Sequence, residues 1–418
     1  MFTQVNCLIS KGFIVSTQYD IVIFGATSFV GQILCQYMVA QYPEGEIAWA
    51  AAGRSQSKLN SVVKSLKQNI PTIIADSDDE MLLRYMAEQS KVIISTVGPY
   101  ALYGSSLVKV CAESGTDYVD LTGEPQWIRK MINLHEATAK ASGARIVHCC
   151  GFDSIPLDLG NFYLQQQAQK VYCAPCTTVK MAVYQMKGAG SGGTFASGIN
   201  MFKEASTDAE LSKGLKDPYF LCSKEHGFSA VQRDVQTAVY DEDFDAWVAP
   251  FVMAVINTKI VHRSNELNGK AFGEKFKYDE VIRIGKGFGS HITASAIGLG
   301  MRIFPLAITL PPSGYLIEKI LPKPGEGPSV KQQNSGFFDL RFIGKTDAGQ
   351  RLTVKVTGDK DPGYGSTAKM LVQAGLCLAQ DISKAEKAGG FWTTATVMGE
   401  PLIKRLTERA GLTFTLLD

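Results

Sequence analysis

Apolar runs alternate with amphipathic segments along roughly the first third of the chain. Tyr19–Phe24 is a β-branched run without polar alternation, which is typical of a strand buried on both faces of a parallel sheet. Apolar residues then recur at helical spacing over Phe29–Tyr42, which predicts a helix. Further strands are expected at Ile47–Ala52, Thr72–Ala75, Val92–Thr96, Tyr118–Leu121 and Arg145–Cys149, and further helices at Ser57–Lys67, Asp79–Gln89 (with Asp78 as its N-cap), Ser105–Ser114 and Pro125–Ala141. Strands that alternate with helices require crossover connections, so the pattern predicts a doubly wound parallel sheet.

The pattern changes after about residue 155. Phe337–Gly344 and Arg351–Thr357 alternate apolar and polar residues, which predicts an antiparallel sheet with one solvated face. Further strands are expected at Thr178–Met186 and Lys275–Ile284, helices that cover the sheet at Gly193–Gly214 and Ala249–Arg263, and C-terminal helices that fold back onto the first domain at Thr367–Gln380 and Pro401–Ala410. The expected fold is therefore α/β, a Rossmann sheet followed by an α+β domain and a C-terminal helical return.

Composition and charge exclude several classes of protein. The chain has 418 residues, of which 45% are hydrophobic and 20% charged, which is typical of a soluble globular protein of two or three domains. The net charge is only +2, and no run of Lys and Arg with interleaved aromatics is present, so we expect no nucleic-acid partner. The nine cysteines are scattered. Cys173-x-x-Cys176 has metal or redox spacing but no second pair, so we expect free thiols in a reducing cytoplasm and no metal site.

The most apolar later segment is Ile292–Leu321. Arg302, Pro305 and Pro311-Pro312 interrupt it, which argues against a simple transmembrane span. We expect a buried helix; the alternatives are a peripheral contact with a membrane and a contact between the subunits of a homodimer. Met1–Gln18 lacks a basic region followed by a long apolar core, so it does not read as a signal peptide.

A glycine-punctuated turn follows the first strand and opens the first helix. It is made by Gly25, Ala26, Thr27, Ser28, Phe29, Val30 and Gly31. A tight turn that presents backbone N–H groups at a helix start is the context in which the pyrophosphate of a dinucleotide binds. Ser28 stands where the standard motif has its middle glycine.

The end of the second strand carries no acid that could accept the ribose 2′-hydroxyl of NAD. Arg54 stands there instead, followed by Ser55 and Lys58, which can hold a 2′-phosphate through charge-assisted hydrogen bonds. The expected cofactor is therefore NADP, as NADPH. Asp76, after the third strand, has two alternatives, an adenine contact or a helix cap. The loop of Val97, Gly98, Pro99 and Tyr100 follows the fourth strand at the carboxyl edge and is expected to pass beside the cofactor.

Several motifs together resemble one family. They are GATSFVG, AGR, STVGPYALYG, DYVDLTGE at Asp117–Glu124, GFDSIPLDLG at Gly151–Gly160, Pro324–Pro328, Gly358–Tyr364 and Gly399–Leu412. As a set they resemble the saccharopine dehydrogenase-like oxidoreductases, in particular the trans-acting enoyl reductase branch. The resemblance covers about residues 19–418 and implies an NADP-binding Rossmann domain, a substrate or dimerisation domain and a C-terminal return. The expected organisation is a tail at 1–16, the Rossmann domain at 17–155, the α+β domain at 156–365 and the helical segment at 366–418.

The resemblance also implies NADPH-dependent reduction of a double bond in a lipid-like or acyl substrate. The alternatives are reduction of an imine in amino-acid metabolism and a non-catalytic NADP-binding protein that docks on lipid or on a partner. No arginine cluster for a dicarboxylate substrate is visible, which favours the acyl substrate.

Hydride transfer needs positioning and one proton donor, so catalytic residues leave little trace in the sequence. We expect the donor among Tyr100, Asp153 and Tyr364. Tyr103, Asp120, Glu124 and His148 are further candidates at the same edge. The glycine-rich stretch Gly188–Gly193 is either an anion-binding helix start or a flexible connection, and we expect the connection.

Overall fold

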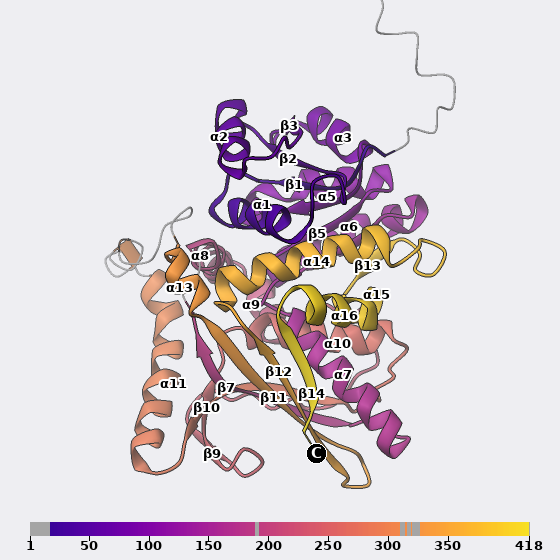
Figure 1. Cartoon of the computed structure of the whole chain (residues 1–418). Helices are drawn as coiled ribbons and strands as arrows, with labels where there is room; N and C mark the ends of the chain where they lie inside the picture. The colour runs from indigo at the N-terminus through magenta and orange to yellow at the C-terminus, as the bar shows by residue number, and fades with distance from the viewer. Residues whose placement is uncertain (1–16, 189–191, 310–313, 316–318, 320–326, 418) are drawn as a thin grey trace, which may run out of the picture.

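Two seven-stranded sheets organise the chain, one above the other in Figure 1. The computed structural model describes residues 17–188, 192–309, 314–315, 319 and 327–417. One apolar core runs from the first sheet to the second, because the same cluster contains Ile21, Leu371 and Val354.

The first sheet is parallel and has the order β13-β6-β5-β4-β1-β2-β3. Its strands are β1 (Tyr19–Phe24), β2 (Trp49–Gly53), β3 (Thr72–Ile74), β4 (Ser90–Ser95), β5 (Asp117–Asp120), β6 (Arg145–Val147) and β13 (Gly390–Trp392). The helices between them are α1 (Phe29–Gln41), α2 (Gln56–Leu66), α3 (Glu80–Glu88), α4 (Tyr100–Tyr103), α5 (Ser105–Ser114) and α6 (Pro125–Ser142). Ile23 lies beside Ala51 of β2 on one side and Ile94 of β4 on the other. The strand order reverses between β1 and β4, so the predicted doubly wound sheet is confirmed.

The second sheet has the order β14-β12-β11-β7-β10-β9-β8. Its strands are β7 (Thr178–Lys187), β8 (Val239–Asp241), β9 (Ala246–Pro250), β10 (Lys277–Gly285), β11 (Phe337–Lys345), β12 (Arg351–Gly358) and β14 (Leu412–Leu416). The predicted antiparallel sheet is wrong in one respect, because β7 and β10 pair in parallel. Helix α7 (Ile155–Tyr172) packs on β11 and β12, and α10 (Ala254–Leu267) packs on β10.

The C-terminal segment joins the two sheets. Helix α14 (Thr367–Gln380) runs between them in Figure 1 and packs on β1, β4 and β5. A Cβ on Gly375 would lie 2.6 Å from Ile94 Cδ1, so the missing side chain lets α14 approach the sheet closely. The rest of the segment comprises η1 (Pro362–Ser366), α15 (Thr394–Val397) and α16 (Gly399–Arg409). The predicted helical return also contributes two strands, because β13 completes the first sheet and β14 the second.

Three local predictions need correction, and one helix was missed. Asp79, not Asp78, caps α3, since its carboxylate accepts from Met81 N and Leu82 N. The helix expected at Ala249–Arg263 begins at Ala254, after β9. The helix expected at Gly193–Gly214 is two helices, α8 (Gly192–Thr207) and α9 (Ala209–Lys216), because Asp208 is the N-cap of α9 and interrupts the first helix. Helix α7 was not predicted, since its sequence is buried nearly all round and lacks an amphipathic period. Residues 189–191 of the glycine-rich stretch lie outside the described residues.

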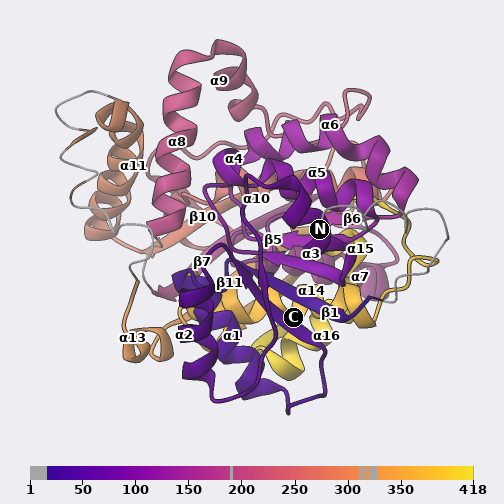
Figure 2. The ribbon, with the colours of Figure 1, turned by 90° about the horizontal axis from the view of Figure 1, so that it is seen from above.

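The helix predicted in Ile292–Leu321 is not buried. Helix α11 (Phe288–Thr309) stands at the edge of the molecule beside α8, as Figure 2 shows, and its large apolar side chains are mostly exposed. Of the helices in the described ranges, it is the one long and apolar enough to cross a membrane. The short helix α13 (Val330–Asn334) precedes β11.

Candidate active site

Two glycines shape the turn between β1 and α1. Gly25 has a φ of +87°, and a Cβ there would lie 2.6 Å from Thr96 Oγ1. A Cβ on Gly31 would lie 2.1 Å from the carbonyl oxygen of Gly25, so α1 can approach β1 only because residue 31 lacks a side chain. The first amides of α1 therefore open at the carboxyl edge of the sheet in a cradle that fits a pyrophosphate.

Ser28, which stands where the standard motif has its middle glycine, caps the first helix. It is the N-cap of α1, and its Oγ accepts a hydrogen bond from Gly31 N at 2.9 Å. The same oxygen lies 3.0 Å from Thr96 Oγ1. The serine therefore stabilises the helix start and ties the turn to the end of β4.

The end of β2 presents a free cation. Arg54 and Lys58 are exposed, and within the described chain Arg54 has no hydrogen bond or ion pair. Ser55 is the N-cap of α2. Asp76 accepts from Asp78 N at 3.3 Å, so it organises the turn before α3 and does not cap that helix. Arg54 is thus available for an anionic ligand.

The loop after β4 holds Tyr100 in the interior. Its hydroxyl donates to the carbonyl of Ser95 at 2.9 Å, and burial raises the pKa of the phenol well above its usual value. Its backbone N–H donates to Glu124 Oε1 at 2.8 Å. A phenol that is buried and already hydrogen-bonded is poorly placed to protonate a substrate.

The carboxylate of Glu124 joins the start of α4 to helix α8. Besides Tyr100 N, it accepts from Ala101 N at 3.0 Å and from Ser197 Oγ of α8 at 2.7 Å. Burial raises the pKa of this carboxyl, and the three donors oppose that rise. Helix α8 follows β7 of the second sheet along the chain. These contacts attach it to the carboxyl edge of the first sheet.

Tyr364, in the C-terminal segment, packs on the glycine turn. Its ring meets Phe29 edge to face, with centroids 5.0 Å apart. Its hydroxyl oxygen accepts from Gly192 N at 3.2 Å. Tyr364 therefore brings η1, the dinucleotide turn and the start of α8 together, although these segments are far apart in sequence.

Asp153 differs from the two tyrosines. It lies on the turn between β6 and α7, half-buried, and its Oδ2 is 3.9 Å from the position that a Cβ on Gly123 would take. Among the residues that the structure describes it has no hydrogen-bond or ion-pair partner. Burial raises its pKa from 3.8 to about 7, so the carboxyl exchanges a proton near neutral pH.

Asp120 and His148 pair with each other inside the core. His148 Nδ1 lies 2.7 Å from Asp120 Oδ2, and both side chains are buried. The imidazole packs against Trp127 and Phe391. Their positions indicate a structural pair. Tyr103, by contrast, is exposed on α4.

A chain of buried polar residues that begins next to Asp153 has no signature in the sequence. Ser154 has a φ of +114°, and its Oγ donates to Asn257 Oδ1 at 3.0 Å. Asn257 Nδ2 donates to Glu280 Oε2 at 2.9 Å, and Tyr278 Oη donates to Glu280 Oε1 at 2.9 Å. These residues lie on three elements, and no spacing in the sequence relates them.

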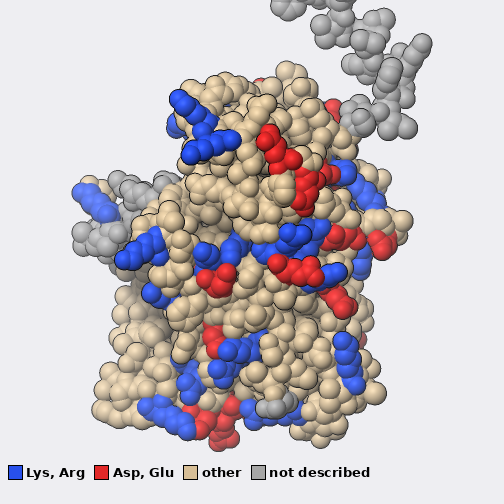
Figure 3. Space-filling view, viewed as in Figure 1, with Lys and Arg blue, Asp and Glu red and all other residues tan. Residues whose placement is uncertain are grey.

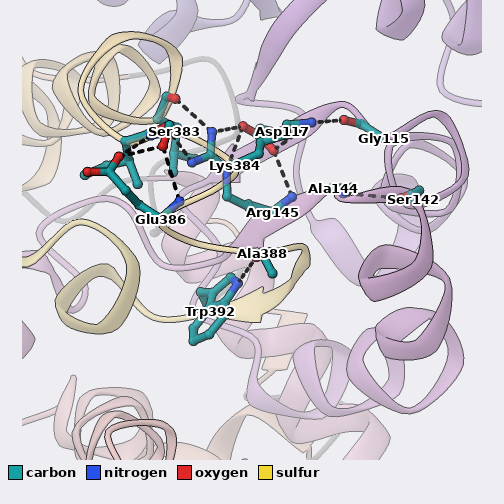
Figure 4. Close-up of polar contacts among 12 residues, drawn as sticks. Gly115, Asp117, Ser142, Ala144, Arg145, Ser383, Lys384, Glu386, Ala388 and Trp392 are labelled. Carbon is teal, nitrogen blue, oxygen red and sulfur yellow. Dashed lines mark hydrogen bonds and ion pairs between the residues drawn. The ribbon is translucent and has the colours of Figure 1, made fainter.

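A cavity of about 560 Å³ opens at the opposite, amino edge of the first sheet. Figure 4 shows four polar residues of its lining, each paired with a neighbouring group: Asp117, Arg145, Ser383 and Lys384. Arg145 Nε donates to Asp117 Oδ2 at 3.0 Å, and Arg145 Nη1 donates to the carbonyl of Ile382 at 2.7 Å. These groups fasten the C-terminal segment to the sheet. Ligands of doubly wound sheets bind at the carboxyl edge, so we place the chemistry at the glycine turn.

The comparisons with known proteins agree with this geometry. Residues 21–147 match the family described as the saccharopine dehydrogenase NADP binding domain. A candidate trans-acting enoyl reductase of Mycobacterium tuberculosis is 38% identical over 407 residues, 93% of this chain and 95% of the relative. The trans-acting enoyl reductases of Mycobacterium bovis and Mycobacterium ulcerans are 36% identical over 408 residues and 35% identical over 413 residues. These alignments cover 93% and 94% of this chain, and 96% of each relative.

The fold also has a solved counterpart. The saccharopine dehydrogenase (L-Glu forming) of Saccharomyces cerevisiae aligns with a TM-score of 0.55 at 12% identity, covering 96% of this chain and all of that one. At this identity the similarity concerns the fold alone. The expected fold, the expected family and the expected cofactor, NADP, are confirmed.

Proposed function

Since the chain belongs to the trans-acting enoyl reductase family and is an NADP-dependent oxidoreductase, we propose that it reduces a carbon–carbon double bond conjugated to a carbonyl in a lipid-like or acyl substrate. The observation that carries the proposal is Asp153. It is a half-buried carboxyl without a partner among the described residues, burial raises its pKa to about 7, and it lies on the same sheet edge as the glycine turn. Such a group is suited to general acid catalysis at neutral pH.

The residues around the turn would hold the cofactor. The first amides of α1 would bind the pyrophosphate, and Arg54, with Ser55 and Lys58, would hold the 2′-phosphate. Val97 and Gly98 would lie beside the nicotinamide half. Bound NADPH supplies the hydride, which would add to the β carbon of the substrate.

Asp153 would complete the reduction. The resulting enolate needs one proton at the α carbon, and the neutral carboxyl of Asp153 would donate it, leaving a carboxylate. Because the side chain is only half-buried, water can return the proton before the next turnover. A Cβ on Gly123 would lie 3.9 Å from Asp153 Oδ2 and 3.9 Å from Met253 Cε, so the carboxyl group has an apolar methyl group nearby.

Competing substrates can be compared in one assay. NADPH oxidation is followed with the full chain and either 2-enoyl thioesters of increasing chain length or an amino acid with an aldehyde that together form an imine. We expect turnover with the enoyl thioesters and a rise in kcat/KM with chain length. Turnover with the imine pair alone would replace this proposal by imine reduction. Tight NADPH binding without turnover on either panel would indicate a non-catalytic NADP-binding protein.

A further inference from the structure

Helix α11 carries an apolar stripe on its outer face. Phe288 is 78% exposed, and the other members of the stripe are also half or more exposed: Ile292 (52%), Leu299 (59%), Ile303 (50%) and Leu306 (66%). They are separated by four, seven, four and three residues, which places them on one side of a helix. A continuous apolar stripe of this length on a surface helix marks an interaction site.

The inner face of α11 is already occupied. Ala294, Gly298 and Ile308 are buried, and the helix packs on β9, β10 and α8. A Cβ on Gly298 would lie 3.0 Å from Thr237 Cα, so the chain approaches closely there. Phe304 meets Phe202 of α8 with ring centroids 6.4 Å apart. To cross a membrane, α11 would have to lose these contacts, so the exposed stripe fits a surface on which the helix lies.

The helix that carries the stripe has a single charged residue, the cation Arg302. From Gly287 to Thr309 the sequence has no Asp or Glu. Arg302 is exposed and has no ion pair within the described chain. Beyond the helix, Lys319 is exposed and lies 4.3 Å from the ring centroid of Tyr315, which is 64% exposed. In Figure 3 the flank formed by α11, at the left, is uncharged over most of its length. Cations and a tyrosine beside an apolar stripe suit a lipid interface with anionic headgroups.

We propose that α11 docks the protein on the surface of a phospholipid membrane that contains anionic lipids. A second copy of the chain fits the stripe less well. Two copies paired along it would bring together two Arg302 side chains with no acid on either helix to neutralise them. Lipid headgroups provide that negative charge, while the acyl chains accept the apolar side chains.

The docking helix adjoins the candidate active site. Helix α8 packs against α11 through Phe202, and Ser197 on the same helix donates to Glu124 at the carboxyl edge. A lipid surface under α11 would therefore lie one helix away from the site. The docking itself is independent of the reaction proposed above.

Co-sedimentation with vesicles tests the proposal on the full chain. Vesicles of phosphatidylcholine alone are compared with vesicles that also contain phosphatidylserine, at low and high salt. We expect binding that increases with phosphatidylserine and decreases with salt. Ile292→Asp and Leu299→Asp should each reduce the partition coefficient by roughly tenfold or more. Met81→Asp is the matched control, because Met81 is 80% exposed on α3, away from the stripe. NADPH affinity and Tm verify that each variant is folded.

Three results would overturn the inference. The first is no sedimentation with either vesicle, and the second is an equal loss of binding in Met81→Asp. The third is a dimer, seen by light scattering, that Ile292→Asp dissociates and vesicles do not affect, which would show that a second copy covers the stripe. Since the vesicles contain no enoyl substrate and the assay needs no turnover, its failure is distinguishable from failure of the proposed reaction.

Discussion

Ser154 Oγ donates to Asn257 Oδ1 over 3.0 Å, and this bond joins the turn that carries Asp153 to helix α10. Both residues are buried, and Ser154 has a φ that L-residues rarely adopt. Asn257 continues to Glu280, and Glu280 to Tyr278. A strained turn persists when its surroundings over-determine it, and this chain of hydrogen bonds does so. The second sheet therefore helps to fix the position of the candidate acid of the first.

Glu280 should make stability depend on pH. Burial, opposed by its bonds to Asn257 and Tyr278, raises its pKa from 4.5 to about 8, so between these values the folded protein holds a proton that the unfolded chain releases. Its contribution is fully present below pH 4.5 and is lost as the pH rises towards 8. In Glu280→Gln this part of the fall in the free energy of unfolding, about 2–5 kcal/mol, should disappear. Denaturant titrations from pH 5 to 8 measure the difference from wild type. Glu225→Gln, at an exposed site, should retain the wild-type slope.

Asp153→Asn should remove the proton donor without disturbing cofactor binding. We expect kcat to fall by about 10²–10⁴-fold while the Kd of NADPH stays the same. In the wild-type protein kcat should decrease above pH 7, because burial raises the pKa of Asp153 to about 7 and the acid form is the active one. The variant should lack this decrease. Asp347→Asn, on the exposed turn between β11 and β12, is the control. A variant with wild-type kcat would exclude Asp153 as the donor.

Arg54→Ala should weaken NADPH selectively. Loss of a charge-assisted contact to the 2′-phosphate is expected to raise the Kd of NADPH by about 10–100-fold and to leave that of NADH unchanged. Fluorescence titration with both cofactors measures the ratio. Lys64→Ala removes an exposed cation from the same helix as Lys58 and should change neither Kd. If Arg54→Ala weakens both cofactors equally, the guanidinium does not select the phosphate.

Gly31→Ala should damage the dinucleotide turn. The new Cβ would meet the carbonyl oxygen of Gly25 at 2.1 Å, so α1 must move away from β1. We expect a loss of about 1–3 kcal/mol in the free energy of unfolding and a large loss of NADPH binding. Gly300→Ala adds a methyl group in open space on α11 and should be neutral or slightly stabilising. Equal Tm values for the two variants would contradict the close helix–strand approach.

Local features of this chain were predictable from the sequence. The strand before Gly25, the glycines of the turn and the cation at Arg54 depend on short-range sterics, periodicity and charge, which a sequence shows directly. The parallel half of the fold follows from the same alternation. Helix α7 escaped prediction because it is buried on nearly all sides, and a helix without a polar face has no helical period to detect.

Only the tertiary structure decided what each candidate could do. Tyr100, Asp153 and Tyr364 were equivalent in the sequence, but packing buries Tyr100 and commits its hydroxyl and places Tyr364 over the turn. The same packing leaves Asp153 half-buried, with a raised pKa and no partner among the described residues. From the sequence, the apolar residues of α11 predicted a buried helix. Apolar periodicity shows that one face of a helix differs from the other, but it does not show which face contacts the protein. Burial and pKa depend on segments hundreds of residues apart, and the chain folding that brings them together is not written in any local pattern.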